Sequence, residues 1–425
     1  MIDDKTIWVK YKNDCIAVII ERGYMIKNKT VIVGVTGSIA AYKAADLVSK
    51  LKKDGVDVHV IMTKNATEII GPITFDTLSG NKCITDTFDR DHDYNVEHVA
   101  LAKKADAFII APATANVIGK LANGIADDML TTTALAFQKT IMLAPAMNTA
   151  MFENKIVQDN IKKLKDYGYE IIEPDDGHLA CGDTGKGKLP DVSIILEHIY
   201  NAIEFEKDMA GKKVLVTAGP TVEHFDPVRF ISNHSTGKMG YELARVAASR
   251  GADVTLISGP VNITPPVGVN LIQVESAADM FEAVKSNYSD KDMIIKAAAV
   301  ADYTPEVISD EKIKKNDEIN TARLVKTNDI LAWLGENKKQ GQFVCGFAME
   351  TKDLIENASA KMRDKNADMI IANNLKTPGA GFAVDTNVIS IITSKGVEKL
   401  PQMTKHEDAV EILNRIIVST GIGEK

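Results

Sequence analysis

The sequence predicts an α/β protein built from two Rossmann-like, doubly wound domains in series. Short apolar, β-branched runs alternate with longer amphipathic segments, which is the pattern of buried parallel strands joined by helices. The alternation stops at residues 204–213, a polar stretch without apolar periodicity, and restarts at Val214. Several runs end in turns rich in Gly, Ala and Asn, where open α/β sheets bind ligands. We therefore expect domains at 25–203 and 214–425, joined by a linker at 204–213.

Composition narrows the function classes. The chain has 425 residues, which suits two or three domains of roughly 150 residues each. Its net charge of −8 disfavours nucleic acid or an anionic membrane as a partner. No apolar run reaches the roughly 18 residues of a membrane span. The four cysteines have no paired spacing, so neither a zinc site nor a disulfide framework is expected, and a reducing cytoplasm fits.

Residues 1–24 fit the alternating pattern poorly. The apolar stretch from Cys15 to Ile20 is too short for a signal peptide core and ends at Glu21. Met25, in contrast, leads directly into the first regular strand. We interpret residues 1–24 as a dispensable extension, either an added leader or a stretch upstream of a translation start at Met25.

The first domain opens with a strand at 31–35, a turn at 36–43 and a helix that ends near Gly55. A phosphate at Gly37-Ser38 would lie on the helix N-terminus, although a plain βαβ turn has the same pattern. A strand at 56–62 follows. The acidic loop at 81–97, with His92 and the adjacent His98, suggests either a metal site or a solvated loop, and the second interpretation is favoured.

Two further strands, at 107–110 and 141–144, each end in Ala-Pro-Ala and are followed by an Asn. Small residues there let a flat ring approach the backbone. Together with Gly-Ser-Ile-Ala-Ala-Tyr-Lys from Gly37, these segments resemble the flavin-containing cysteine decarboxylases, whose cofactor is FMN. The resemblance implies a set of FMN-binding residues: Gly37, Ser38, Ile39, Thr63, Ala113, Thr114 and Ala115.

Residues 173–190 are rich in glycine, and Cys181 lies in the middle of them. The pattern predicts a mobile lid that brings a thiol over a substrate, with a plain linker as the alternative. Lys186 and Lys188 would lower the pKa of that thiol. By resemblance, Cys181 is a proton donor, His98 a base or orienting residue, and Asn148 the ligand of the substrate carboxylate. The family usually has Gly before this His, where this sequence has Glu97.

The second domain opens with a strand at 214–216, a polar loop, and a helix that Gly237 begins. Free N–H groups at such a helix start suit an anion. The loop is not a Walker A motif, because Ser232 and Met239 stand where that motif needs Gly and Ser or Thr, and no GxGxxG is present. A-G-P-T and D-P-V-R-F-I-S-N-H-S-T-G-K-M-G resemble the phosphopantothenate–cysteine ligase domain of bacterial bifunctional coenzyme A biosynthesis proteins. The resemblance implies that Asn233 holds the activated acyl group.

A strand at 293–295 ends in K-A-A-A-V-A-D-Y, and the charge run E-K-I-K-K follows at the family's distance. The resemblance implies a CTP site, with Lys312 as a catalytic residue and Asp302 as the candidate magnesium contact. The segment K-T-N-D-I lacks the family's Pro, which weakens the backbone contact there. The implied CTP residues are Lys296, Ala297, Ala298, Asp302, Lys312, Asn328, Asp329, Ile330, Leu331, Phe347, Lys361 and Lys365.

The resemblance covers about residues 25–420 and implies a bifunctional enzyme. CTP would activate phosphopantothenate as an acyl cytidylate, which cysteine then attacks. FMN-dependent decarboxylation would convert phosphopantothenoylcysteine to phosphopantetheine. The alternatives are a nicotinamide-dependent dehydrogenase with tandem Rossmann units, and a regulatory flavoprotein without activity. We also expect a cytoplasmic homo-oligomer whose two halves fold separately.

Overall fold

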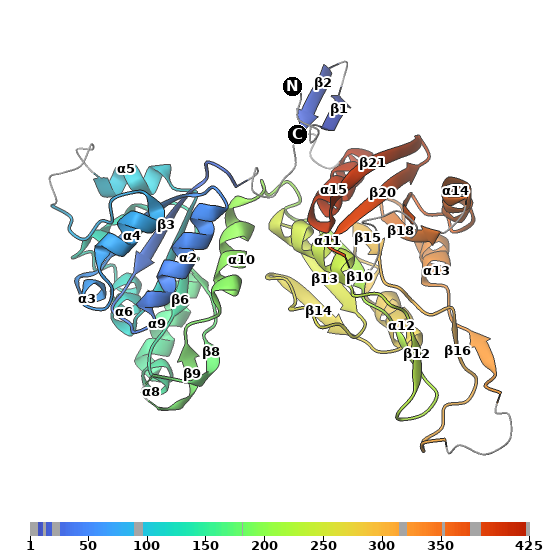
Figure 1. The fold of residues 1–425 in the computed structure, drawn as a ribbon, viewed down its shortest axis with the longest axis horizontal. Coiled ribbons are helices and arrows are strands. Elements are labelled where there is room, and N and C mark those ends of the chain that lie inside the picture. Colours follow the sequence, from blue (N-terminus) through green and yellow to red (C-terminus); the bar gives the residue numbers. More distant parts are fainter. Residues whose placement is uncertain are drawn as a thin grey trace. The chain divides into compact units, whose positions relative to one another are not determined.

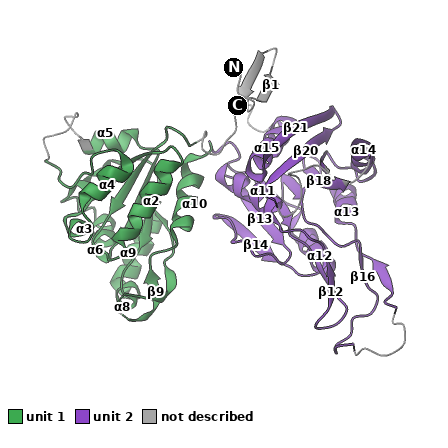
Figure 2. Cartoon of the chain, in the orientation of Figure 1, with its two compact units in different colours: residues 1–205 green, residues 206–425 purple. Residues whose placement is uncertain are grey.

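The computed structural model describes residues 7–11, 14–18, 26–88, 97–180, 182–313, 321–350, 353–374 and 384–421. The chain divides into two compact units, residues 1–205 and 206–425 (Figure 1, Figure 2). Three sequence predictions lie wholly or partly outside the described residues: most of the extension 1–24, residues 89–96 of the acidic loop, and Cys181. Within the extension, β1 (Ile7–Tyr11) pairs antiparallel with β2 (Asp14–Val18).

Unit 1 contains a parallel five-stranded sheet in the order β4-β3-β5-β6-β7. Its strands are β3 (Thr30–Val35), β4 (Asp57–Met62), β5 (Ala107–Ala113), β6 (Ile141–Pro145) and β7 (Glu170–Ile171). The strand order reverses between β3 and β5. That point is where doubly wound sheets of this order bind their ligand.

Helices cover both faces of this sheet (Figure 1). They are α2 (Ala41–Lys53), α3 (Lys64–Thr67), α4 (Pro72–Ser79), α5 (Glu97–Lys104), α6 (Ala115–Ala122), α7 (Met129–Ala136), α8 (Thr149–Phe152), α9 (Lys155–Asp166) and α10 (Val192–Ile203). Alternate β3 residues enter different cores: Val31 packs with α2 and α10 residues, and Ile32 packs with α6 and α7 residues. Both faces are therefore buried, as the continuous apolar run predicts.

The glycine-rich segment 173–190 is more regular than the predicted loop. It forms an antiparallel hairpin of β8 (Asp175–His178) and β9 (Thr184–Lys188). Gly187 has φ of 137°, and a Cβ there would lie 2.3 Å from the carbonyl oxygen of Met147. The glycines therefore let the hairpin lie directly on the segment that follows β6. The usual sequence signal of a strand is alternation of apolar and polar residues. These two strands lack that signal, since close backbone contact, rather than apolar side chains, holds them against the neighbouring segment.

Unit 2 contains an eight-stranded sheet in the order β14-β13-β10-β15-β18-β19-β20-β21. The first six strands pair in parallel, and the last two are added by antiparallel pairing of β20 with β19 and of β21 with β20. The strands are β10 (Lys213–Ala218), β13 (Asp253–Ser258), β14 (Val269–Gln273), β15 (Met293–Lys296), β18 (Phe343–Glu350), β19 (Met369–Asn374), β20 (Thr386–Thr393) and β21 (Gly396–Thr404). The prediction of two doubly wound α/β domains is confirmed.

The helices of unit 2 are α11 (Lys238–Ser249), α12 (Ala277–Asn287), α13 (Ile330–Asn337), α14 (Leu354–Asp364) and α15 (Lys405–Thr420). Two ribbons extend from the sheet: β11 (Val222–His224) with β12 (Phe230–Ser232), and β16 (Tyr303–Pro305) with β17 (Leu324–Lys326). Among the described helices of the chain, none is both long and apolar enough to cross a membrane.

Residues 206–212, within the predicted linker, pack on unit 2. Met209 is fully buried, and its N–H donates to the carbonyl of Arg250 at 2.9 Å. Asp208 accepts two hydrogen bonds from the Arg250 guanidinium, at 2.9 and 2.5 Å. The few apolar side chains of this polar stretch show no periodicity, so the burial of Met209 could not be predicted from the pattern.

Candidate functional sites

Unit 1 contains a cavity of about 740 Å³ at the carboxyl ends of β3, β5 and β6. It brings together most of the predicted flavin residues and one predicted catalytic residue: Gly37, Ser38, Ile39, Thr63, Thr114, Ala115 and Asn148. These residues come from segments far apart in the sequence. They lie together because β3, β5 and β6 are neighbours in the sheet and end at the same edge. A cavity of this volume is in the usual range for a cofactor site.

The turn after β3 is closely packed. A Cβ at Gly37 would lie 2.5 Å from the Cβ of Asn65, so only glycine fits without movement. The buried hydroxyl of Thr36 donates to the carbonyl of Pro112 at 2.7 Å and accepts from the N–H of Thr114 at 3.1 Å. These bonds fix the ends of β3 and β5 to each other at the switch point. Thr36 therefore positions the cavity wall. The sequence pattern gives no signal for this role, because the bond partners of Thr36 lie 76 and 78 residues away in the sequence.

Asn148 lies where the hairpin crosses the cavity. Its side-chain oxygen accepts from the N–H of Ala150 at 2.9 Å and so caps α8. Its amide nitrogen donates to a carboxylate oxygen of Asp183 in the hairpin turn at 2.5 Å. The N–H of Met147 donates to the carbonyl of Gly187 at 3.0 Å. The hairpin is thus bonded to the cavity wall at Met147 and at Asn148.

Among the described residues that line the cavity, none is acidic, although the chain has a net charge of −8. The titratable members of the lining include Lys43 on α2 and Lys188 and His178 on the hairpin. An electropositive, mostly apolar cavity suits a ligand with an aromatic ring and anionic groups. Asn65, His178 and Met151 also line it, and the sequence analysis did not assign them a role.

Two predicted residues lie outside this lining. Ala113 is fully buried within β5, one residue before the lining starts. His98 lies at the start of α5 and is half-buried, but it is not among the described residues that line the cavity. Cys181 belongs to the part of the hairpin turn that the structure does not describe.

Unit 2 has a cavity of about 290 Å³ at the carboxyl end of β15. Seven predicted nucleotide residues line it: Lys296, Asp302, Asn328, Asp329, Ile330, Leu331 and Lys361. Val300, Ala301, Tyr303, Lys326 and Thr327 complete the lining. The hydroxyl of Thr327 donates to the carbonyl of Ala301 at 2.6 Å, and this bond joins the two chain segments that form the walls.

Lysines dominate the electrostatics of this second cavity. Burial, together with the charge of Lys361, lowers the pKa of Lys296 to about 8. Burial opposes ionisation of Asp329 too, but the N–H of Ala332 and the ammonium of Lys365 outweigh it and lower its pKa. Lys296 donates to the carbonyl of Ala298 at 2.9 Å, and Lys361 donates to the carbonyl of Phe347 at 3.0 Å. An added anion would stabilise both ammonium groups.

The remaining predicted residues lie around this cavity or away from it. Lys365 pairs with Asp329 at 2.9 Å, and Asn233 donates to the carbonyl of Ala299 at 2.9 Å. Ala297 and Ala298 bond Thr217 through their N–H groups, and Phe347 is half-buried.

Lys312 is exposed on the connection between β16 and β17, and it is not among the residues that line the cavity. The next residue, Ile313, accepts a hydrogen bond from Arg229 at 2.5 Å and donates one to Asp226 at 3.1 Å. The described end of this connection is therefore tied to the turn between β11 and β12.

Two family models match the chain: Flavoprotein over residues 19–204, and DNA/pantothenate metabolism flavoprotein C-terminal domain over residues 209–419. The chain is 49% identical over 406 residues to the Coenzyme A biosynthesis bifunctional protein CoaBC of Bacillus subtilis, covering 94% of this chain and 100% of the relative. The chain belongs to the CoaBC family of bifunctional coenzyme A biosynthesis proteins.

The CoaBC protein of Borreliella burgdorferi is 46% identical over 392 residues, which cover 92% of this chain and 99% of the relative. A solved C-terminal domain of a CoaBC protein is 44% identical, with a TM-score of 0.44, and covers 50% of this chain and 98% of that one. Membership in the CoaBC family confirms the prediction of a bifunctional enzyme with decarboxylase and ligase activities, the first on a flavoprotein domain. The nicotinamide dehydrogenase alternative is not favoured.

Proposed function

We propose that unit 1 binds FMN and decarboxylates phosphopantothenoylcysteine, and that unit 2 makes this compound from phosphopantothenate, cysteine and CTP. The observation that carries the proposal is the meeting of the predicted residues in two separate cavities, one in each unit. Each cavity has an excess of cationic side chains suited to phosphorylated ligands. The product of the unit 2 reaction is the substrate of the unit 1 reaction, so one chain performs two consecutive steps.

In unit 1, the turn at Gly37-Ser38 receives the FMN phosphate, and the small residues Thr114 and Ala115 leave room for the ring. The glycine whose Cβ would collide with Asn65 supports this fit. FMN, when bound, supplies the electron sink that a β-thiol carboxylate lacks. Asn148 binds the substrate carboxylate. Its hydrogen bond to Asp183 fixes the orientation of its side-chain amide at the cavity wall. Cys181 donates a proton in the reductive half of the reaction.

In unit 2, Lys296 and Lys361 hold the CTP phosphates, and Asn233 orients the activated acyl group. Lys312 approaches the triphosphate from the β16–β17 connection. Positioned cations stabilise the charge that develops as pyrophosphate leaves. Among the described residues, no group of three or more His, Cys, Asp or Glu is arranged to hold a metal ion. We propose that magnesium binds with the triphosphate and that Asp302, which lines the cavity, contributes one contact to it.

We also propose that the enzyme acts in the cytoplasm as a homo-oligomer. Two described cysteines, Cys83 and Cys345, are buried and free, as a reducing compartment allows.

The test is the mass of the product that the purified protein makes from phosphopantothenate, cysteine and CTP. We expect phosphopantetheine, with pyrophosphate released and a yellow protein throughout. Lys312→Ala should lose pyrophosphate release but still decarboxylate supplied phosphopantothenoylcysteine. Equal loss of both steps, or a colourless protein that takes up no FMN, would contradict the proposal.

A further inference from the structure

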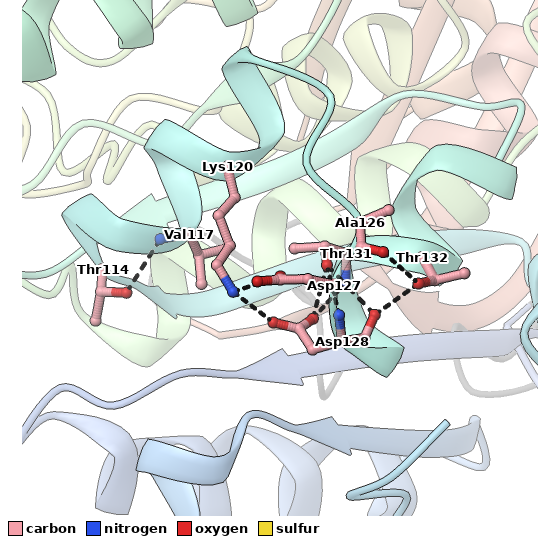
Figure 3. Close-up of polar contacts among 8 residues, drawn as sticks. All are labelled: Thr114, Val117, Lys120, Ala126, Asp127, Asp128, Thr131 and Thr132. Atoms are coloured by element: carbon pink, nitrogen blue, oxygen red, sulfur yellow. Dashed lines mark hydrogen bonds and ion pairs between the residues drawn. The ribbon is translucent and has the colours of Figure 1, made fainter. Parts of the chain in front are cut away.

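A cluster of charged residues lies one helical turn away from the wall of the flavin cavity. Lys120 extends from α6 to the carboxylates of Asp127 and Asp128, in the connection that leads to α7 (Figure 3). The ammonium lies 2.6 Å from Asp127 and 3.0 Å from Asp128. The side chain of Lys120 is only 19% exposed, so the pair is shielded from solvent on the lysine side.

The cluster is bonded beyond the two ion pairs. Asp128 caps α7, because one of its oxygens accepts from the N–H and from the hydroxyl of Thr131, both at 2.8 Å. Burial disfavours the ionised form of Asp128, but the bonds from Thr131 and Lys120 outweigh it and lower the pKa. The hydroxyl of Thr132 donates to the carbonyl of Asp128 at 2.7 Å. A single carboxylate thus joins α6 to the start of α7.

Helix α7 in turn is held against the sheet. Leu130 is 1% exposed, and a Cβ at Gly34 in β3 would lie 2.5 Å from its Cδ1 atom. The leucine occupies the space that the glycine leaves, so α7 cannot approach or slide without a clash. The cluster therefore connects α6 to a fixed element of the core.

Helix α6 carries one wall of the cavity. Thr114 caps it, and Thr114, Ala115, Asn116 and Val117 line the cavity. Lys120 follows Asn116 by four residues and Val117 by three, so it lies on the same face one turn further along. Helix α6 has only eight residues, and a rotation at one end moves the other.

We propose that Lys120, with Asp127 and Asp128, positions the Thr114–Val117 wall for the flavin. Lys120 is not among the residues that line the cavity, and it acts through α6. The inference rests on the proposed FMN site and adds positioning residues that the family resemblance did not assign. Geometry carries it: the shielded ion pair, the capped α7 and the packed Leu130.

The test compares variants of the full-length protein. Lys120→Met removes the charge and keeps most of the length, Lys120→Arg keeps the charge, and Asp128→Asn keeps a capping side chain but loses the ion pair. Lys165→Met is the matched control, because Lys165 pairs with Glu173 at 2.9 Å on another part of unit 1 and lies outside the cavity lining. Titration of the flavin-free protein with FMN, followed by flavin fluorescence, gives Kd.

We expect Lys120→Met to raise the FMN Kd about tenfold, Asp128→Asn to raise it less, and Lys120→Arg to restore it to within about threefold of wild type. At saturating FMN, the visible circular dichroism of the bound flavin should change in Lys120→Met and not in Lys165→Met. An unchanged Kd and spectrum in both Lys120→Met and Asp128→Asn would overturn the inference. If the wild type binds no FMN, the proposed function fails instead, which is a distinct result.

Discussion

At the scale of single residues, Lys296 shows how the second cavity prepares for an anion. Burial and the neighbouring Lys361 lower its pKa to about 8 from the usual 10.5. The folded state therefore binds fewer protons than the unfolded state between these two values. Stability contributed by this group increases as the pH rises through that window, and at pH 7 the charged lysine costs stability. A bound triphosphate would reverse the effect, because it favours the ammonium.

We therefore expect CTP binding at pH 8.5 to take up protons. Calorimetry in two buffers that differ in ionisation enthalpy measures the uptake. Lys296→Arg keeps a charge that does not titrate in this range, so this variant should bind CTP with no uptake from position 296. Equal uptake in the wild type and in Lys296→Arg would show that Lys296 is not in contact with the nucleotide.

Cys181 carries a prediction that depends on the family resemblance, since the structure does not describe this residue. Cys181→Ser should still release carbon dioxide, because the thiol serves only the reductive half. The saturated product should fall by about a hundredfold or more, the usual contribution of a positioned proton donor. Carbon dioxide and phosphopantetheine are measured in the same reaction. A wild-type ratio of the two products would refute the assignment.

At the scale of elements, the β8–β9 hairpin is held on the cavity by backbone contacts. Gly187 is the position where this contact tolerates no side chain, since a Cβ would meet the Met147 carbonyl at 2.3 Å. Gly187→Ala should displace the hairpin and separate Asp183 from Asn148. Decarboxylation should fall more than tenfold, by the loss of about 1.4 kcal/mol or more of transition-state stabilisation.

Gly168→Ala is the control for this variant. Gly168 also has a positive φ, of 88°, but a Cβ added there would meet open space, with no packing neighbour within 4 Å. It shares the backbone strain and lacks the collision. Steady-state decarboxylation by both variants, with far-UV circular dichroism to confirm folding, separates the two effects. Similar rates in both would mean that the hairpin contact does not matter for the reaction.

Most parallel strands and long helices follow from apolar periodicity, because burial on both faces leaves a continuous apolar run, as in β3 and β5. The hairpin does not follow, since its strands are stabilised by glycine contacts that have no apolar signal. Site residues that end strands, such as Gly37 and Lys296, could be predicted from position and resemblance. The roles of Thr36 and Lys120 could not be predicted. Thr36 bonds residues that are distant in the sequence, and Lys120 bonds carboxylates whose position depends on the course of a short connection.

At the scale of the whole chain, two units with separate cavities predict separable activities. The structure refines where the second fragment must begin, because residues 206–212 pack on unit 2. A fragment of residues 206–425 keeps Met209 and the Asp208–Arg250 pair, and a fragment of residues 211–425 loses both. Burial of a Met side chain contributes about 1.5 to 3 kcal/mol.

We expect both fragments to fold, with the melting temperature of 211–425 lower by about 3 to 10 °C. Residues 25–203 should be yellow and decarboxylate, and 206–425 should be colourless and release pyrophosphate from CTP. Differential scanning calorimetry and the two assays check this. A folded 206–425 fragment that is inactive until the flavin half is added would show that the halves share a site.

The two sheets differ in strand order in a way that bears on ancestry. In unit 1 the third parallel strand, β5, lies beside the first strand, whereas in unit 2 the third strand, β14, lies beyond the second. This difference argues against an origin of the chain by duplication of one domain. One reading frame that encodes both units also keeps the two enzymes of consecutive steps in equal amounts in the cell.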